Sequence, residues 1–297
     1  MGALQKIGEG TIIETRFLGK ESDRAPQFEA ILLTSCIIYP MKYWRETLAV
    51  AQRILIELLR RRRSLIFWLI FPLAVLAINS LVWAEQAQMS IAQAFEFIAP
   101  SALVGSALFF SCLGGTVATV VSEREQQTLK RLFLSPLSGT SYFFGIFIAH
   151  SWIGMGQVLI VYSVAAFWGA RFQGSLLLGA ALILLSIVSY VGLGFILGTQ
   201  LGRRTEDVNA LVATFGVPLL ILGGAFFPSS LFPDKLLQIA RINPIYHMNE
   251  ALVAVAANGE NLSKIESHFW FLCGFSAFVI LGGWLSYWQM LESERSL

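Results

Sequence analysis

The chain has 297 residues, of which 56% are hydrophobic and 13% are charged, and its formal net charge is +2. The apolar residues are gathered into long runs, and about 20 such residues are enough to cross a bilayer as a helix. Membrane barrels instead alternate polar and apolar residues over strands of about 10. The composition therefore predicts an all-α integral membrane protein. It leaves no room for a soluble enzyme-sized domain and gives no reason to expect nucleic acid as a partner.

Residues 1–40 are polar and mixed in charge, with acidic residues that interrupt any secretory signal. We expect them to form a mobile cytosolic tail, followed by one membrane domain over 41–297. In the segment 43–63, apolar residues recur at helical spacing, and the segment ends in four consecutive arginines. This pattern predicts a cytosolic amphipathic helix that lies in the inner membrane interface and leads into the membrane.

The membrane domain is predicted to contain six spans, which are apolar runs separated by charged or Gly- and Pro-containing connections. The spans are approximately 64–83, 97–121, 141–168, 175–201, 207–227 and 269–290. Pro72, Pro218 and the pair Gly223-Gly224 would bend or loosen their spans.

Lys and Arg residues gather in the connections on one side of these spans. They include Arg60 to Arg63 before the first span, Arg124, Lys130 and Arg131 after the second, and Arg203 and Arg204 after the fourth. Connections on the other side are poor in positive charge. The positive-inside rule therefore predicts a multi-pass protein of the cell inner (plasma) membrane, with both termini and the segment 122–140 in the cytosol.

The segment 122–140 is charged and helix-prone, and it separates two spans. Three apolar residues at i, i+3 and i+4 would form a stripe on a short helix that ends at Pro136. The mixed signs of its charges favour docking to a soluble partner over binding to an anionic leaflet, with an ordinary solvated connection as the alternative. The candidate docking residues are Glu123, Arg124, Glu125, Thr128, Leu129, Leu132, Phe133 and Pro136.

Small residues recur every four positions inside the spans, most regularly at Gly194, Gly198 and Gly202. Such a ridge lets helices pack closely in lipid. Close packing within one subunit is the first interpretation of the ridge, and a dimer seam or a sliding surface is the second.

The connection after the fifth span begins at Pro228 and is predicted to contain two short helices. Asn243 is suited to cap the second helix, with Pro244 in its first turn. The apolar run 245–257 is too short to span a bilayer, which predicts re-entrant or interfacial half-helices on the outer side. Glu250 within this run is either a carboxylate at the headgroup level or a polar contact at the exit of a pathway.

Several kinds of chemistry lack their residues in this chain. There is no phosphate-binding loop motif, so ATP and its Mg²⁺ must be bound by another chain, and there is no metalloprotease motif or other metal-ligand spacing. Cys36, Cys112 and Cys273 form no disulfide framework. His150 is the only histidine within a predicted span; it is either a base for Ser111 or Ser151, or a hydrogen-bonded packing residue.

Two stretches resemble the membrane subunits of type 2 ATP-binding-cassette exporters. The first is GGTVATVVSEREQQTLKRLFLSPLSGTSYFFGIFIAH, at 114–150, with a Glu-rich loop, a Thr-Leu pair and a Ser-Pro before the third span. The second is GGAFFPSSLFPDKLLQIARINPIYHMNEALVAV, at 223–255, with a Pro-terminated fifth span, a short helix and an Asn-Pro. The resemblance covers about 43–291.

The resemblance implies a permease subunit that pairs with a second copy of itself or a related permease, over separate nucleotide-binding ATPase subunits. The loop at 123–133 would transmit nucleotide-driven closure to the spans. Drug, lipo-oligosaccharide and polysaccharide exporters share this architecture. Phe-rich spans, with Phe109, Phe110, Phe143, Phe144 and Phe147, suit a lipophilic compound or lipid-linked glycan, and the alternative is that these side chains simply face lipid. The competing hypothesis is a motorless intramembrane enzyme or a membrane scaffold.

Overall fold

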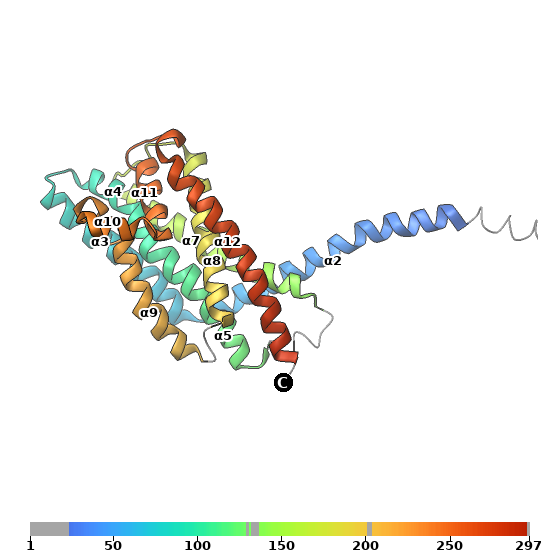
Figure 1. Ribbon diagram of the computed structural model, residues 1–297. Coiled ribbons are helices and arrows are strands. Elements are labelled where there is room, and N and C mark those ends of the chain that lie inside the picture. Colours follow the sequence, from blue (N-terminus) through green and yellow to red (C-terminus); the bar gives the residue numbers. More distant parts are fainter. Residues whose placement is uncertain (1–23, 129–130, 132–136, 201–203, 296–297) are drawn as a thin grey trace, which may run out of the picture.

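The computed structural model describes residues 24–128, 131, 137–200 and 204–295, and every regular element in these residues is a helix. Figure 1 shows them as a bundle from which the first part of α2 projects. The elements are α2 (Arg24–Arg60), α3 (Arg62–Gln86), α4 (Ile91–Ala102), η1 (Leu103–Gly114), α5 (Gly115–Glu125), α7 (Gly139–Phe167), α8 (Leu176–Gln200), α9 (Thr205–Leu222), η2 (Ser229–Leu231), α10 (Asp234–Ala240), α11 (Pro244–Ala256) and α12 (Leu262–Arg295).

Among the described residues, five helical segments are long and apolar enough to cross a membrane. They are α3, the continuous segment Ile91–Glu125, α7, α8 and the part Leu262–Met290 of α12. The fifth expected span, 207–227, corresponds to α9, whose apolar part Val212–Leu222 is shorter. It ends at Leu222 rather than near 227 because Gly224 follows with a φ of +75°, a left-handed conformation that ends a helix.

The second span departs from an ordinary α-helix in its middle. The twelve residues of η1 form a π-helix between α4 and α5, and nearly all of its side chains are buried. Ser106 and Ser111 donate their hydroxyl hydrogens to the carbonyls of Ala102 and Ala107, four residues earlier. Hydrogen bonds of this kind from a serine to the carbonyl four residues earlier often bend a helix locally. The apolar pattern alone predicts a regular helix here.

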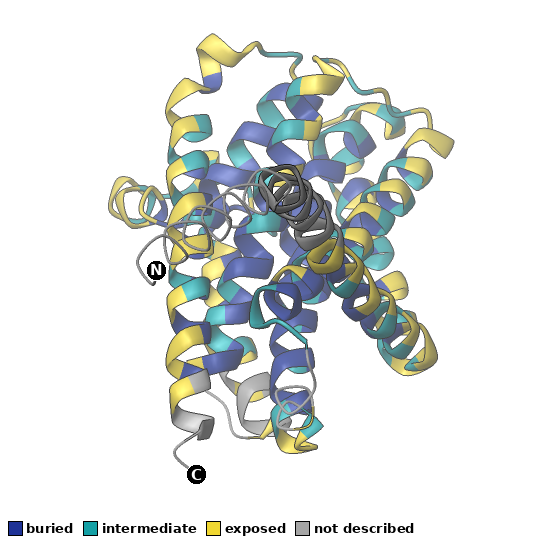
Figure 2. Ribbon diagram, turned by 90° about the vertical axis from the view of Figure 1, so that its right-hand side faces the viewer, coloured by how far each residue is buried: buried dark blue, intermediate teal, exposed yellow. Residues whose placement is uncertain are grey.

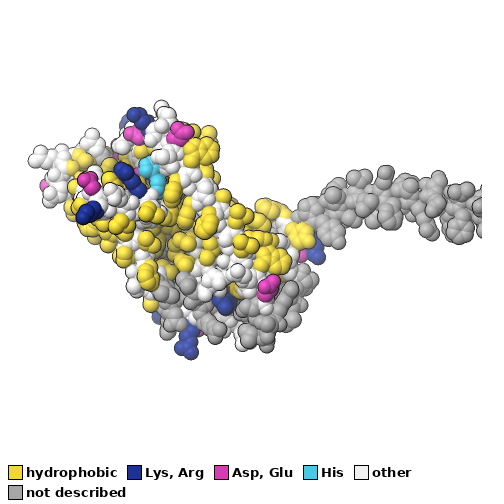
Figure 3. All heavy atoms as spheres, in the orientation of Figure 1, with side chains coloured by type: hydrophobic (Ala, Val, Ile, Leu, Met, Phe, Trp, Pro, Cys, Tyr) yellow, Lys and Arg dark blue, Asp and Glu magenta, His cyan; other side chains and the backbone are white. Residues whose placement is uncertain are grey.

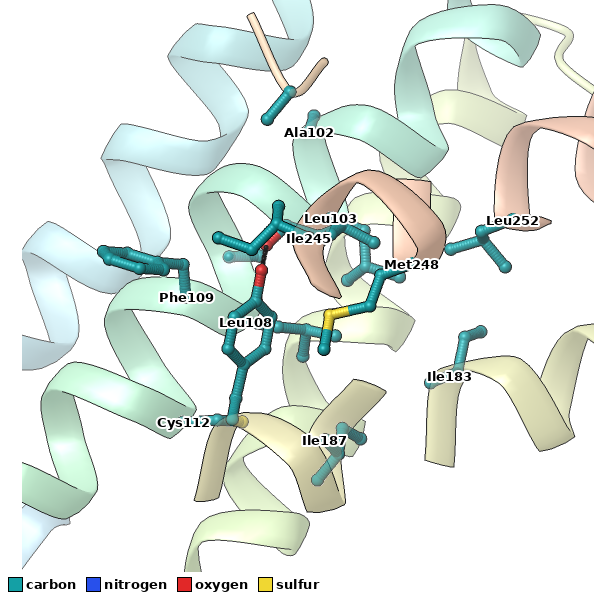
Figure 4. Packing of buried hydrophobic residues seen from close by; sticks show 14 of the residues in the cluster. Ala102, Leu103, Leu108, Phe109, Cys112, Ile183, Ile187, Ile245, Met248 and Leu252 are labelled. Carbon is teal, nitrogen blue, oxygen red and sulfur yellow. Dashed lines mark hydrogen bonds between the residues drawn. The ribbon is translucent and has the colours of Figure 1, made fainter. Parts of the chain in front are cut away.

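The core lies where η1, α8 and α11 meet. Ile245, Met248 and Leu252 of α11 are at most 4% exposed and pack with residues of η1 and α8, as Figure 4 shows. Figure 2 shows the buried residues concentrated on the inner faces of the helices. The short helix α11 is therefore part of the bundle interior rather than a surface element.

The outer faces of the bundle are strongly apolar. Ile70 and Ile78 of α3 and Phe278 and Leu281 of α12 are each at least 60% exposed. Figure 3 shows hydrophobic side chains covering the middle of one face, with charged side chains mainly near its upper and lower margins. Because large exposed apolar patches are rare on soluble monomers, this belt is the surface expected of a protein surrounded by lipid.

Helix α2 differs from the expected lead-in helix in two ways. It begins at Arg24 rather than near Tyr43, and it ends at Arg60, one residue before a break at Arg61. Its buried stripe contains Val50, Ala51 and Ile54, which pack against α7, whereas Trp44 is 59% exposed. Residues 1–23 lie outside the described part of the chain.

Candidate functional site

The last turn of α5 is joined to two other helices through the carboxylate of Glu123. Oε1 accepts a hydrogen bond from the Arg53 guanidinium of α2, and Oε2 accepts one from the Tyr142 hydroxyl of α7. Glu123 is 4% exposed, while the Arg53 side chain is 35% exposed. An enclosed carboxylate needs such partners because burial without them is costly. We call Glu123, Arg53 and Tyr142 the junction.

The same turn of α5 is held on its other side by α8. Arg124 donates from Nη1 to the carbonyl oxygen of Thr199 at 2.9 Å, in the last turn of α8. Carbonyls at a helix C-terminus lack intrahelical donors and carry partial negative charge, so a guanidinium is a suitable partner. The end of α5 is thus bonded to α2, α7 and α8 together.

The start of α7 is also bonded to α2. Glu46 Oε2 accepts from the Ser138 backbone N–H at 3.2 Å and from the Ser141 hydroxyl at 3.1 Å. Ser138 caps α7 through the Ser141 N–H. Both ends of the connection 126–138 are therefore bonded to the same helix. Glu46 and Arg53 are seven residues apart, which places them on one helix face.

These contacts correct the expected placement of Glu123. It does not lie on a partner-facing surface, because α2 and α7 enclose it. The expected single helix is also interrupted: α5 ends at Glu125, and Gln127 has a φ of +55°. Glu125 is exposed and Thr128 is half-buried. Leu129, Leu132, Phe133 and Pro136 lie outside the described residues.

Sequence reasoning missed Arg53, Tyr142 and Glu46 as members of this region. The available signal was the spacing of Glu46 and Arg53 on one face of a helix otherwise rich in apolar residues. That spacing gives no information about the partner, which is 70 residues away in the case of Arg53 and Glu123.

At the opposite end of the bundle, the predicted start of α11 is confirmed. Asn243 is its N-cap, with Oδ1 accepting from the Ile245 N–H at 3.0 Å, and Pro244 is in the first turn. Asn243 also donates from Nδ2 to the Leu219 carbonyl of α9 at 2.6 Å. Pro228 precedes η2, and Glu250 accepts a hydrogen bond from the Ser229 hydroxyl at 2.6 Å.

Two histidines meet beside this helix. His247 Nε2 lies 2.8 Å from the Arg241 carbonyl, which can only accept, so Nε2 carries the proton. Its Nδ1 lies 2.9 Å from Nδ1 of His268 and accepts from it. The ring of His247 stacks on Phe271 with a centroid distance of 3.8 Å. Burial lowers the pKa of His247 below its ordinary value of 6.5.

The glycine ridge of α8 packs inside the chain. A Cβ added at Gly194 would lie 2.6 Å from the Leu113 carbonyl oxygen, and one at Gly198 would lie 3.0 Å from the Val120 side chain. The glycines let η1 and α5 come this close to the backbone of α8 and pack on it. This geometry favours packing within one subunit over a dimer seam; Gly202 lies outside the described residues.

An apolar pocket of about 390 Å³ lies between η1, α8, α9, α11 and α12. Phe109, Tyr190, Phe215, Met248 and Phe275 line it. Ile245 also lines it, and Figure 4 shows Phe109, Ile245 and Met248 among the buried side chains of the core. Phe143 and Phe147 are not among its described lining residues: Phe143 belongs to the buried cluster around Tyr142 and Tyr287, and Phe147 packs against that cluster.

His150 is fully buried and is not arranged as a base for a serine. Its Nε2 lies 3.1 Å from Thr119 Oγ1, while Ser111 donates to the Ala107 carbonyl. This arrangement is that of a packed, hydrogen-bonded histidine.

The comparisons with known proteins agree with this architecture. Residues 45–256 match the family model described as ABC-2 type transporter. The chain is 26% identical over 176 residues to "Probable multidrug ABC transporter permease YbhR" of Escherichia coli strain K12, covering 59% of this chain and 47% of that protein. It is 25% identical over 194 residues to "ABC transporter G family member 20" of Dictyostelium discoideum, covering 64% and 25%.

A third relative is "Putative transport permease ycf38" of Porphyra purpurea, 25% identical over 226 residues, which cover 74% of this chain and 77% of the relative. The chain spans half or less of the length of the first two relatives. The family model nevertheless covers well over half of the chain and includes the junction, the glycine ridge and α11. The chain therefore belongs to the ABC-2 type transporter family of membrane proteins.

Proposed function

We propose that this chain is the membrane-spanning permease subunit of an ATP-driven exporter. A separate ATPase subunit would bind ATP and Mg²⁺, since this chain lacks a phosphate-binding loop motif. The chain would cross the cell inner (plasma) membrane six times, with α9 as the fifth span and both termini in the cytosol. A second copy of the chain, or a related permease, would complete the pathway.

The observation that carries this proposal is the fastening of the connection 126–138 at both ends. Glu123 joins its start to α2 and α7, Arg124 joins it to α8, and Glu46 joins its end to α2. A force applied to this connection by a soluble partner would therefore move several spans together. Leu129, Leu132 and Phe133 are proposed to supply the apolar contact with the ATPase, and the neighbouring charges its register.

The cargo is proposed to be a lipophilic compound or a lipid-linked glycan. The apolar pocket of about 390 Å³ supports this class, because ligand pockets of drug size commonly occupy about 300 to 1,000 Å³ and are lined by aromatic and aliphatic side chains. The YbhR relative is named a probable multidrug permease, which supports a drug-like compound among these cargoes. The α11 segment would be a re-entrant element on the outer side.

The experiment is co-expression of the tagged chain with its ATPase subunit, purification in mild detergent, and an ATPase assay of the complex. We expect Leu132→Asp to abolish association, because a charge would replace an apolar contact. Glu123→Ala is expected to keep association but lose stimulation of the ATPase by cargo, since Glu123 lies inside the bundle.

Glu266→Ala is the matched control, because Glu266 is an exposed carboxylate near the start of α12. It should leave both association and stimulation unchanged. A chain that purifies without an ATPase under these conditions, or a Leu132→Asp variant with unchanged association and transport, would contradict the proposed function.

A further inference from the structure

A second pocket, distinct from the apolar one, lies at the end of the bundle that contains α11. Its volume is about 270 Å³, and it is bounded by α3, α4, the segment after α9, and α11. Its polar side chains come from all four of these regions. They include Asn79, Ser101, Ser229, Ser230, Asn249 and Glu250.

The side-chain oxygen of Asn249 is buried and accepts no hydrogen bond from the described residues. Its side chain is 3% exposed, and Nδ2 donates to the Gly224 carbonyl at 3.0 Å. Because a carbonyl can only accept, this bond also establishes which way the amide is turned. Oδ1 is then left without a hydrogen-bond partner in the described part of the chain. An unpaired buried acceptor is unfavourable, so a donor brought by a ligand would be stabilised here.

The charge of the pocket selects against anions. Its described lining contains one carboxylate, Glu250, and neither lysine nor arginine. A phosphate or carboxylate group would meet Glu250 without any cation to offset the repulsion. The ligand is therefore neutral or cationic.

The hydrogen-bonding groups decide between these two. Asn79, Ser101 and Ser230 can each donate and accept, which matches hydroxyl groups that do the same. An ammonium group only donates, so the donors of these side chains would find no acceptor on it. Trp83 and Phe97 line the same pocket, with ring centroids 5.9 Å apart and planes tilted by 53°. They offer apolar ring faces beside the polar groups, which suits the C–H face of a sugar ring.

We propose that this pocket binds a single neutral hexose ring, the polar head of a glycolipid. Its volume is slightly below that of pockets that hold drug-sized ligands, about 300 Å³ and upward, so it suits one ring rather than an oligosaccharide. The step from a bound sugar ring to an exported glycolipid rests on the proposed function. The sugar site itself does not, because it is defined by the side chains of this chain alone.

The test is saturation-transfer difference NMR on the full chain, purified in a detergent without a sugar headgroup. The probes are methyl β-D-glucopyranoside and methyl α-D-mannopyranoside. We expect saturation transfer to the ring protons of at least one probe. We expect about tenfold weaker binding in both Asn79→Leu and Asn249→Leu, since each removes hydrogen-bonding capacity from the pocket.

Asn261→Ala is the matched control, because Asn261 is exposed and does not line the pocket. It should bind the probes as the wild-type chain does. Two pocket variants are used because Asn249→Leu changes a buried residue and could misfold. Asn79 is only half-buried, so Asn79→Leu tests the pocket with less disturbance of the fold. Absence of saturation transfer to both probes, or equal transfer in the two pocket variants and the wild type, would overturn the sugar site.

Tetramethylammonium serves as the competing probe. Saturation transfer to it, lost in Glu250→Gln and accompanied by none to the sugars, would identify a cation site and refute the proposal. The assay contains neither nucleotide nor ATPase. Sugar binding by a chain that never associates with an ATPase would refute the exporter alone, while an active exporter without sugar binding would refute this site alone.

Discussion

Glu123 is a charged residue that lies inside the bundle rather than on its surface. Its carboxylate joins α5 to Arg53 of α2 and Tyr142 of α7, and it is almost entirely enclosed. Charged residues are enclosed in this way only when paired. At the scale of single residues, the junction is therefore a positioning device for the connection that follows it.

Removing the carboxylate should destabilise the chain measurably. We expect Glu123→Ala to lower the free energy of unfolding by about 1–3 kcal/mol, because it leaves the Arg53 guanidinium and the Tyr142 hydroxyl without their acceptor. The loss is moderated because the Arg53 side chain is 35% exposed and can turn to solvent. Denaturant unfolding in detergent, monitored by circular dichroism, measures the effect.

A double-mutant cycle isolates the pair. The variant with both Arg53→Ala and Glu123→Ala should be less destabilised than the sum of the two single variants, since each single change already breaks the bond. Glu266→Ala should change stability by no more than about 0.5 kcal/mol. Additive losses in the double variant would mean that Arg53 and Glu123 do not interact.

His247 should make the α11 end of the bundle sensitive to acid. Burial lowers its folded pKa below 6.5, although Glu250 and the Arg241 carbonyl act in the opposite direction and His268 adds to the lowering. The unfolded chain therefore binds a proton at higher pH than the folded chain does. The contribution of His247 to the free energy of unfolding is fully present above about pH 6.5 and is lost as the pH falls toward the folded pKa.

The measurement is the thermal unfolding midpoint at about pH 7.5 and pH 5.5. We expect a lower midpoint at the acidic pH for the wild-type chain and a smaller difference for His247→Gln, which cannot be protonated. An equal drop in both proteins would assign the acid sensitivity to other groups.

At the scale of elements, the second span is held in place by its packing on α8. Gly194 and Gly198 allow η1 and α5 to approach its backbone, and Arg124 bonds its C-terminus. Gly194→Ala should destabilise the chain by about 1–3 kcal/mol, because the added methyl group would lie 2.6 Å from the Leu113 carbonyl oxygen and the helices would have to separate.

Gly156→Ala in α7 is the matched control, since a Cβ there meets no atom within 4 Å. Alanine is the better helix former by about 1 kcal/mol, so this variant should be as stable as the wild type or more so. Denaturant unfolding of both variants in the same detergent makes the comparison. Equal destabilisation of the two would mean that helix propensity, and not close packing, explains the ridge.

The π-helix η1 is an element that the apolar pattern did not predict. A continuous apolar run is compatible with any helix type, and the choice depends on how the buried serines and neighbouring helices satisfy the backbone. By contrast, the start of α11 was predicted correctly because Asn243 and Pro244 act locally, through a cap and a restricted φ.

At the scale of the whole molecule, the arrangement of charges predicts an orientation. Arg61 bonds to Ser122 of α5 and Arg124 to the end of α8, so this basic cluster lies at the α5 end, while Figure 1 shows α10 and α11 at the other end. In a chain whose native cysteines are replaced, we expect Asn261→Cys to react with an impermeant maleimide in intact cells. Gln127→Cys should react only after permeabilisation.

Both positions are exposed, so differences in labelling report the side of the membrane rather than burial. The reverse labelling pattern would invert the proposed topology. Equal labelling of both positions in intact cells would contradict a membrane barrier between them.

The amino-acid sequence by itself determined the helical membrane class, five of the six expected spans in approximate position, the cap of α11 and the family resemblance. These depend on run length, spacing and neighbouring residues, all of which are local along the chain. The tertiary structure alone decided that Glu123 is enclosed by α2 and α7, that Gly194 faces η1, that α11 enters the core, and that Asn249 is left with an unpaired oxygen. Each of these depends on contacts between residues far apart in the chain, and helices of similar apolar composition can pack on one another in many ways until their side chains are placed in space.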